Sequence, residues 1–306
     1  MIFSKQHRGQ VSGILALLIL FLTTLLCFIP ILFLGLLKLL PSQRLKVNCT
    51  KVVDKIATEW VNINILYVQK SKLVQWEITG LNHLSPESWH LVIANHQSWL
   101  DIVVLQNVLH QKIPVLKFFI KDQLKWIPLL GFSWWAMGCP FMKRYTAAYL
   151  AKHPHKKGKD IEATQKALYL FKQTPATLMS FVEGTRYTLK KKLQQQSPYQ
   201  HLLKPKAGGI GFVISTMNQH INQLLDVTIT YPKDDHSLWN FLCHRMGTIK
   251  VHVRQLPIPA AFLSPSLIED EKIQADFRQW LNEQWSEKDR LITAMKNPSE
   301  NANVTI

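Results

Sequence analysis

The stretch LVIANHQSWLDIVVL, residues 91–105, decides the expected fold. Its first residues form a short apolar run, which is typical of a strand buried on both faces. The polar residues NHQS come next, and apolar residues then resume, with Ser98 available to cap a helix. We therefore expect a buried strand, a tight polar turn and a helix in direct succession, as in an α/β fold.

Similar apolar segments recur along the chain. Further strands are expected at 72–79, 113–120, 178–185, 224–232 and 248–256, and helices at 51–68, 98–109, 165–172 and 268–292. This alternation indicates an α/β fold with a mixed sheet flanked by helices. The domain that contains the sheet is expected to span 46–292, and the polar end, 293–306, to be disordered.

The most marked compositional feature lies near the N-terminus, where residues 11–37 contain no charged side chain. This stretch is longer than the roughly 20 residues that cross a bilayer, so residues 1–45 are interpreted as a hydrophobic helical membrane anchor. Pro30 removes a helical hydrogen bond and predicts a kink or a break. A kinked helix would cross once, whereas a broken one would return to the same side. Positive charges on both flanks favour the re-entrant form.

A second uncharged stretch, WIPLLGFSWWAMGCPFM, occupies residues 126–142. Its tryptophans and the basic residues on both sides favour a surface that lies in the membrane interface. A buried core segment is the alternative interpretation.

The overall charge points to an anionic partner. The chain has 36 Lys and Arg against 20 Asp and Glu, a formal net charge of +16. Nucleic acid, an acidic membrane surface and phosphorylated substrates all fit this balance. The four cysteines have no CxxC spacing, so they predict neither a disulfide framework nor a zinc site.

The pair His96 and Asp101 is the first candidate for chemistry. On a regular helix, side chains five residues apart point about 140° away from each other. The two can meet only if His96 lies on the strand-to-helix turn and Asp101 in the first helical turn, as the pattern suggests. Asp101 could then accept a hydrogen bond from one imidazole nitrogen and leave the other to take a proton from a hydroxyl. A capping turn with a chance histidine is the simpler interpretation of this motif alone.

Three further polar stretches follow apolar segments: GCPFMKR at 138–144, FVEGTR at 181–186 and KPKAGG at 204–209. In FVEGTR, the glycine lets the backbone approach a ligand and Arg186 can hold a phosphate with two hydrogen bonds. Taken singly, each stretch is also explained as a polar turn or a basic surface loop.

Together, NHQSWLD, GCPFMKR and FVEGTR resemble the glycerophospholipid acyltransferase family, which includes the 1-acylglycerol-3-phosphate acyltransferases. The family pattern is NHxxxxD, a G-x-x-F-x-x-R block, F-x-EGTR and an apolar strand that ends in proline. The resemblance covers roughly residues 70–260 and is greatest to the lysocardiolipin-type branch and its bacterial relatives. It implies that 46–292 is an acyltransferase catalytic domain of the fold this family shares.

The resemblance also implies a role for each matched residue. His96 is the general base that deprotonates the acceptor hydroxyl, and Asp101 orients it. The substrate-binding residues are Asn95, Lys121, Arg144, Glu183, Gly184, Thr185 and Arg186. Among them, the two arginines bind the acceptor phosphate with help from the lysine, the glutamate and Gly184 position the glycerol part, and the asparagine holds the turn. The fourth block reads TITYP where V-P-V-x-P is usual, which leaves the acyl-chain contacts open.

The expected activity is transfer of a fatty acyl group from acyl-CoA or acyl carrier protein to the hydroxyl of a lysophospholipid. The first choice of acceptor is 1-acyl-sn-glycerol 3-phosphate, and another lysophospholipid or glycerol 3-phosphate is the alternative. No metal and no cofactor besides the donor are expected. A membrane-tethered nucleic-acid binder is the competing class, but the recognisable modules are absent from the sequence. The expected location is the bacterial inner membrane, with the catalytic domain facing the cytoplasm.

Overall fold

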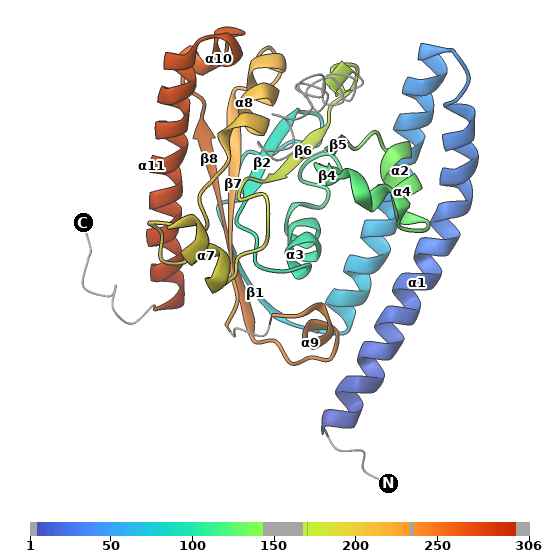
Figure 1. Cartoon of the computed structure of the whole chain (residues 1–306). Helices are drawn as coiled ribbons and strands as arrows, with labels where there is room; N and C mark the ends of the chain where they lie inside the picture. Colours follow the sequence, from blue (N-terminus) through green and yellow to red (C-terminus); the bar gives the residue numbers. More distant parts are fainter. Residues whose placement is uncertain (1–4, 143–167, 170, 233–235, 298–306) are drawn as a thin grey trace.

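The computed structural model describes residues 5–142, 168–169, 171–232 and 236–297 (Figure 1). At its centre is a six-stranded sheet with the strand order β1-β8-β7-β2-β6-β3. The strands of this sheet are β1 (Gln75–Thr79), β2 (His90–Ala94), β3 (Leu116–Phe118), β6 (Thr177–Phe181), β7 (Gln223–Thr230) and β8 (Thr248–Pro257). β2, β3, β6 and β7 are mutually parallel, whereas β8 runs antiparallel to β7 and parallel to β1. The expected mixed α/β sheet is therefore confirmed.

Helices cover both faces of this sheet. The longer ones are α1 (Lys5–Leu37), α2 (Gln43–Lys70), α3 (Leu100–Leu109), α8 (Ala207–Thr216) and α11 (Glu271–Lys296). Shorter elements are β4 (Ile120–Lys121), η1 (Asp122–Trp126), α4 (Leu130–Ala136), β5 (Phe141–Met142), α7 (Leu189–Gln195), α9 (Leu238–Leu242), η3 (Ala260–Phe262) and α10 (Ser266–Glu269). The sequence predicted most strands within a few residues but missed α7 and α8. Half of the helix expected at 165–172 lies outside the described residues.

The burial of β2 explains its uninterrupted apolar sequence. Because successive side chains of a strand point to opposite faces, Leu91 and Ile93 join the core beneath α8 and α11. Val92 and Ala94 join the core on the other face, beneath α3. All five residues of β2 are buried, as is typical of a central parallel strand.

The N-terminal anchor differs from the expectation at Pro30. α1 continues through this proline to Leu37, and the chain reverses only at residues 38–42, before α2 begins. A proline costs one backbone hydrogen bond, and a long helix keeps the remaining ones on both sides. The two helices run antiparallel, with Nε1 of Trp60 donating to Oγ1 of Thr24 at 3.1 Å. The prediction that the helix breaks at Pro30 into a re-entrant pair was therefore wrong. A helical hairpin does form, but its turn lies at residues 38–42.

α2 is amphipathic, as the sequence predicted. Its buried residues include Val53, Ala57, Val61, Ile65 and Val68, which recur at three- and four-residue steps and face the rest of the protein. The domain boundary expected at 45/46 falls in the first turn of this helix, and the boundary expected at 292/293 falls inside α11.

The two uncharged stretches pack against each other. Gly35 of α1 leaves room for the ring of Phe132 in α4, because a Cβ on this glycine would lie 2.5 Å from the ring. Phe28 contacts the same ring edge-on, with the centroids 6.0 Å apart. Beyond these contacts much of α1 presents exposed apolar side chains, and its length and composition would allow it to cross a membrane. α1 and α11 lie on opposite sides of the sheet (Figure 1).

A buried ion pair joins the helical hairpin to the sheet. Lys117 of β3 has a side chain only 1% exposed, and its Nζ donates to Oδ2 of Asp54 in α2 at 2.7 Å. The same nitrogen donates to the carbonyl oxygen of Met137, after α4, at 2.8 Å. One ammonium group thus connects three elements that are distant in the sequence.

We expect Asp54→Asn to lower the free energy of unfolding by about 2–4 kcal/mol, because it leaves the buried Lys117 ammonium without a counter-charge. Chemical or thermal denaturation of the full chain in detergent micelles measures this loss. The control is Asp122→Asn, which removes a carboxylate from a lysine, Lys125, that is 36% exposed. The control should cost less than about 1 kcal/mol. Equal losses in the two variants would show that burial of Lys117 is unimportant.

Candidate active site

The candidate site forms where parallel strands end. β2 pairs with β6 on one side and with β7 on the other, so residues after all three strands meet at one edge of the sheet. This edge is where ligands gather in open α/β folds. The motif NHQSWLD follows β2, EGTR follows β6, and Tyr231 follows β7.

His96 and Asp101 meet as the sequence predicted. His96 lies on the turn between β2 and α3, Asp101 lies in the first turn of α3, and Nδ1 is 2.7 Å from Oδ2. An ionised carboxylate only accepts hydrogen bonds, so the proton of a neutral imidazole lies on Nδ1 and Nε2 is left as the acceptor. The His96 side chain is 16% exposed, whereas Asp101 is fully buried. The pair can therefore orient one basic nitrogen toward a bound molecule.

His96 is one of several hydrogen-bond donors to Asp101. Its Oδ2 also accepts from the backbone N–H groups of Gln97 at 2.6 Å and of Ser98 at 2.9 Å. Its Oδ1 accepts from the hydroxyl of Tyr231 at 2.6 Å. Four donors compensate the desolvation of this carboxylate and fix its position.

Tyr231 is the site residue whose role the sequence analysis missed. It belongs to the TITYP block, which was matched only loosely to the family pattern. Its ring is buried against Asp101, and burial together with this carboxylate raises the pKa of its hydroxyl well above 10. The hydroxyl is therefore a permanent donor to Asp101. The signal in the sequence was its position near the end of the strand expected at 224–232.

Asn95 and Gln97 hold the turn around the histidine. The Asn95 side chain donates from Nδ2 to the carbonyl of Ile229 and accepts from the same residue's N–H, both at 2.9 Å. The Gln97 side chain donates to that carbonyl as well, also at 2.9 Å. A buried amide thus extends the pairing of β2 with β7 by one residue. These bonds agree with the expected role of Asn95 in the turn, and its contact with substrate stays a prediction.

Glu183 supports the same turn from β6. The fully buried carboxylate accepts from the backbone N–H of His96 at 3.1 Å and from that of Leu203 at 3.2 Å. Burial raises the pKa of Glu183 to about 8, and the two N–H groups and the nearby Lys288 only partly oppose this shift. With both oxygens directed at backbone groups, Glu183 positions His96. Its expected contact with glycerol stays a prediction.

The imidazole of His96 rests on an aromatic ring. The ring of Phe181, the last residue of β6, is stacked on it with the centroids 3.9 Å apart and the planes inclined by 12°. The backbone N–H of Tyr187 donates to the carbonyl of His96 at 2.7 Å. Residues on both sides of EGTR therefore restrict the rotation of the histidine.

The EGTR residues after Glu183 form a turn beside the pair. Gly184 has a φ of +71°, a conformation that glycine adopts without strain. Oγ1 of Thr185 accepts from Nζ of Lys191 at 2.8 Å. The guanidinium of Arg186 is exposed and lies 5.7 Å from the ring centroid of Trp99, the residue just before α3. This arginine is thus held near the start of α3 while its donors stay accessible to an anion.

Two other residues, Lys121 and Arg144, were also expected to bind phosphate. Lys121 is exposed at the end of β4, which follows β3 past the same edge of the sheet. β4 pairs with β5, so Lys121 lies beside Met142. Arg144 lies outside the described residues.

The shifted pKa of Glu183 predicts a pH-dependent stability. A carboxyl whose pKa rises from 4.5 to about 8 on folding stabilises the fold below pH 4.5, and this contribution is lost as the pH rises through 8. We expect Glu183→Gln to reduce the fall in melting temperature between pH 5 and pH 8.5, whatever its effect at pH 5. Glu269→Gln, at an exposed position, is the control. Parallel curves for the wild type and Glu183→Gln would contradict the assignment.

Comparisons with known proteins agree with this geometry. The family described as Acyltransferase matches residues 75–231, about half of the chain. Mouse 1-acyl-sn-glycerol-3-phosphate acyltransferase epsilon is 26% identical over 264 residues, which cover 79% of this chain and 67% of that protein. The 1-acyl-sn-glycerol-3-phosphate acyltransferase of Saccharomyces cerevisiae is 29% identical over 140 residues, 45% of this chain and 42% of that protein.

The fold has a solved counterpart. The crystal structure of the 1-acyl-sn-glycerophosphate (LPA) acyltransferase PlsC from Thermotoga maritima superposes with a TM-score of 0.56 at 15% identity. The match covers 95% of this chain and 98% of that one. At this identity the likeness concerns the fold alone. The matched family, which spans the strand ends that carry His96, Glu183 and Tyr231, shows that the chain belongs to the acyltransferases.

Proposed function

We propose that the protein is a membrane-bound enzyme that acylates a lysophospholipid. The acyl group comes from the thioester of acyl-CoA or acyl carrier protein, and the acceptor is 1-acyl-sn-glycerol 3-phosphate, which gives phosphatidic acid. The observation that carries this proposal is the contact between His96 and Asp101 at the end of β2. The names of the mouse and yeast relatives support the choice of acceptor.

The reaction needs one base and no covalent enzyme intermediate. Nε2 of His96 takes the proton of the acceptor hydroxyl while the oxygen of that hydroxyl attacks the carbonyl carbon of the thioester. The carbon–sulfur bond then breaks, and the leaving thiolate takes the proton back from the imidazolium. The buried Asp101 stabilises the imidazolium between these steps.

Among the described residues, neither Ser98 nor Cys139 is a better nucleophile. The hydroxyl oxygen of Ser98 accepts from the N–H of Leu100 at 2.8 Å, which holds it at the start of α3. Burial raises the pKa of the Cys139 thiol to about 12, so this cysteine does not supply a thiolate near neutral pH. Direct transfer between the two substrates is the mechanism that fits these residues.

Exposed basic residues would bind the acceptor phosphate. Arg186 lies beside the turn that carries His96, and its planar donors suit a phosphate. Lys121, and Arg144 from the resemblance, complete the proposed set. Phosphate binding at this edge would bring the glycerol hydroxyl to Nε2 of His96.

Membrane attachment through α1 would supply the lipid. The exposed apolar surface of α1 and its contact with α4 fit a hairpin seated in one face of a bilayer. The donors are cytoplasmic, so we place the catalytic domain on the cytoplasmic side. The bacterial inner membrane stays part of the proposal, since the relatives named above come from both eukaryotes and a bacterium.

The test is an assay of the purified full chain in detergent with acyl-CoA and a panel of acceptors, with products read by mass. We expect the highest kcat/KM with 1-acyl-sn-glycerol 3-phosphate. His96→Ala should lower the rate by about 10²- to 10⁴-fold, because a general base is lost. An unchanged melting temperature serves as its folding control. A folded and active His96→Ala variant would remove the histidine as base, and preference for glycerol 3-phosphate or another lysophospholipid would change the acceptor.

Tyr231→Phe tests the support of Asp101. The substitution keeps the ring, which stacks on His236 with the centroids 4.8 Å apart, and removes only the hydroxyl that donates to Oδ1. We expect kcat to fall about tenfold, the order of one hydrogen bond to a charged group, while both KM values stay within about twofold. Steady-state kinetics measure the split. A rise in KM at constant kcat would instead make Tyr231 a substrate-binding residue.

A further inference from the structure

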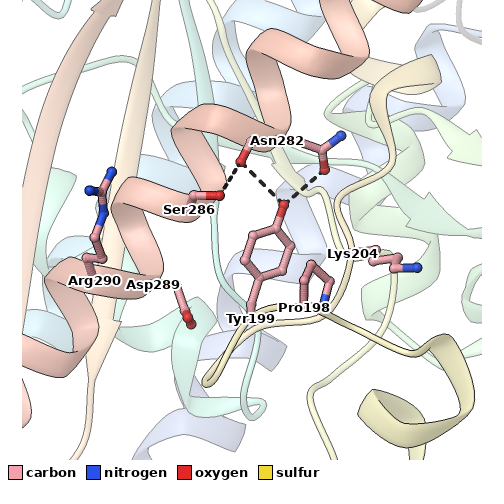
Figure 2. A pocket seen from close by; sticks show the side chains of 7 residues that line it. All are labelled: Pro198, Tyr199, Lys204, Asn282, Ser286, Asp289 and Arg290. Atoms are coloured by element: carbon pink, nitrogen blue, oxygen red, sulfur yellow. Dashed lines mark hydrogen bonds between the residues drawn. The ribbon is translucent and has the colours of Figure 1, made fainter.

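A pocket lies outside the His96 site, between α11 and the segment that precedes α8 (Figure 2). It has a volume of about 680 Å³ and is open to solvent. Its lining residues are Pro198, Tyr199, Lys204, Asn282, Ser286, Asp289 and Arg290. None of them belongs to the acyltransferase motifs.

The wall of this pocket is fixed by hydrogen bonds to α11. The carboxylate of Asp289 accepts from the backbone N–H of Gln200 at 2.6 Å and from that of His201 at 2.7 Å. The hydroxyl of Tyr199 donates to Oδ1 of Asn282 at 3.0 Å, as Figure 2 shows. The Asp289 carboxylate is thus held by the loop, with each of its oxygens directed at a backbone N–H group.

Two cations flank the pocket. Lys204 and Arg290 are both exposed, and neither head group makes a hydrogen bond or ion pair with a described residue. Figure 2 shows them on opposite sides of Tyr199. Long side chains placed in this way suit a ligand with two separated anionic groups. Between them, Pro198 is exposed and offers a small apolar surface, whereas the ring of Tyr199 is buried in the core.

Lys204 of the pocket is next in sequence to Leu203, which is connected by hydrogen bonds to the reaction centre. The N–H of Leu203 donates to the Glu183 carboxylate that also accepts from the N–H of His96. The carbonyl of Leu203 accepts from Nε1 of Trp285 at 3.0 Å, which ties this segment to α11. A molecule in the pocket would therefore lie within reach of a group that reacts beside His96.

The pocket faces water under the proposed membrane attachment. α11 covers one face of the sheet, and α1 and α2 lie on the other side (Figure 1). An amphiphilic thioester could extend its acyl chain toward the hairpin and its polar end toward α11.

We infer that this pocket binds the nucleotide end of acyl-CoA, with Lys204 and Arg290 contacting its phosphates. Coenzyme A carries a pyrophosphate and a separate 3′-phosphate, which match two separated cations, and its adenine could contact the exposed ring of Pro198 between them. A carrier protein offers a single phosphodiester at the same distance from its thioester. The inference rests on the proposed function and selects one of its two donors.

Binding is tested first, without turnover. Adenosine 3′,5′-bisphosphate is titrated calorimetrically into the full chain in detergent, and into the double variant Lys204→Gln/Arg290→Gln. We expect affinity to fall about tenfold in the variant, as two solvent-exposed charge-assisted contacts are lost. The control is Lys272→Gln/Arg278→Gln, which removes the same charge from exposed positions of α11 about 18 Å or more from Arg290. Equal affinity in both double variants would overturn the inference.

Kinetics then separate this inference from the proposed function. In the Lys204→Gln/Arg290→Gln variant, KM for acyl-CoA should rise about tenfold, while KM for the S-acyl pantetheine thioester and for the lysophospholipid stays constant. If the variant transfers acyl groups with an unchanged KM for acyl-CoA, the proposed function is retained and the assignment of the pocket to coenzyme A is refuted. Specific binding of the bisphosphate by a protein that transfers no acyl group would retain the pocket and refute the function.

Discussion

The whole site depends on the burial of one carboxylate. Asp101 is fully removed from water, so its charge must be met by donors, and four are supplied by two different strand ends. Two of them are N–H groups of the turn after β2, one is the imidazole of His96, and one is the Tyr231 hydroxyl after β7. Their combined geometry fixes where the imidazole points. Removal of any element that brings these donors together would change the position of the basic nitrogen.

A second buried carboxylate extends this constraint to β6. Glu183 binds the backbone of His96 from the opposite side, and its other oxygen binds Leu203. The central strands β6, β2 and β7 are thus joined beyond their last ladder pairs by side chains from each of them. Because parallel strands end at one edge, Asp101 and Tyr231, which are 130 positions apart in the sequence, together hold a single histidine. The fold positions His96 through these contacts, and an isolated HxxxxD segment would not hold it.

Much of the fold and of the site could be predicted from the sequence, and the parts that could not be predicted have physical reasons. The run LVIA required a strand buried on both faces, and the spacing of His96 and Asp101 allowed contact only across a turn, so both were predicted. The Tyr231 hydroxyl and the Leu203 N–H were missed because their roles depend on strand order, which local patterns do not contain. Pro30 was misjudged because a helix stabilised along its length by α2 and α4 tolerates the loss of one hydrogen bond. Glu183 was identified, but its burial came from packing against the segment before α8, a helix that KPKAGG did not reveal.

The two faces of the sheet differ in the kind of molecule they can receive. On the hairpin side, α1 exposes apolar side chains, and the Lys117 ion pair joins α2 to β3. On the α11 side, the surface near the site is polar and basic. Under the proposed function, such an arrangement would let a lipid and a water-soluble thioester meet while each stays in its own phase. The edge where β2, β6 and β7 end is common to both faces, and His96 lies on it with one nitrogen held by Asp101 and the other left to react.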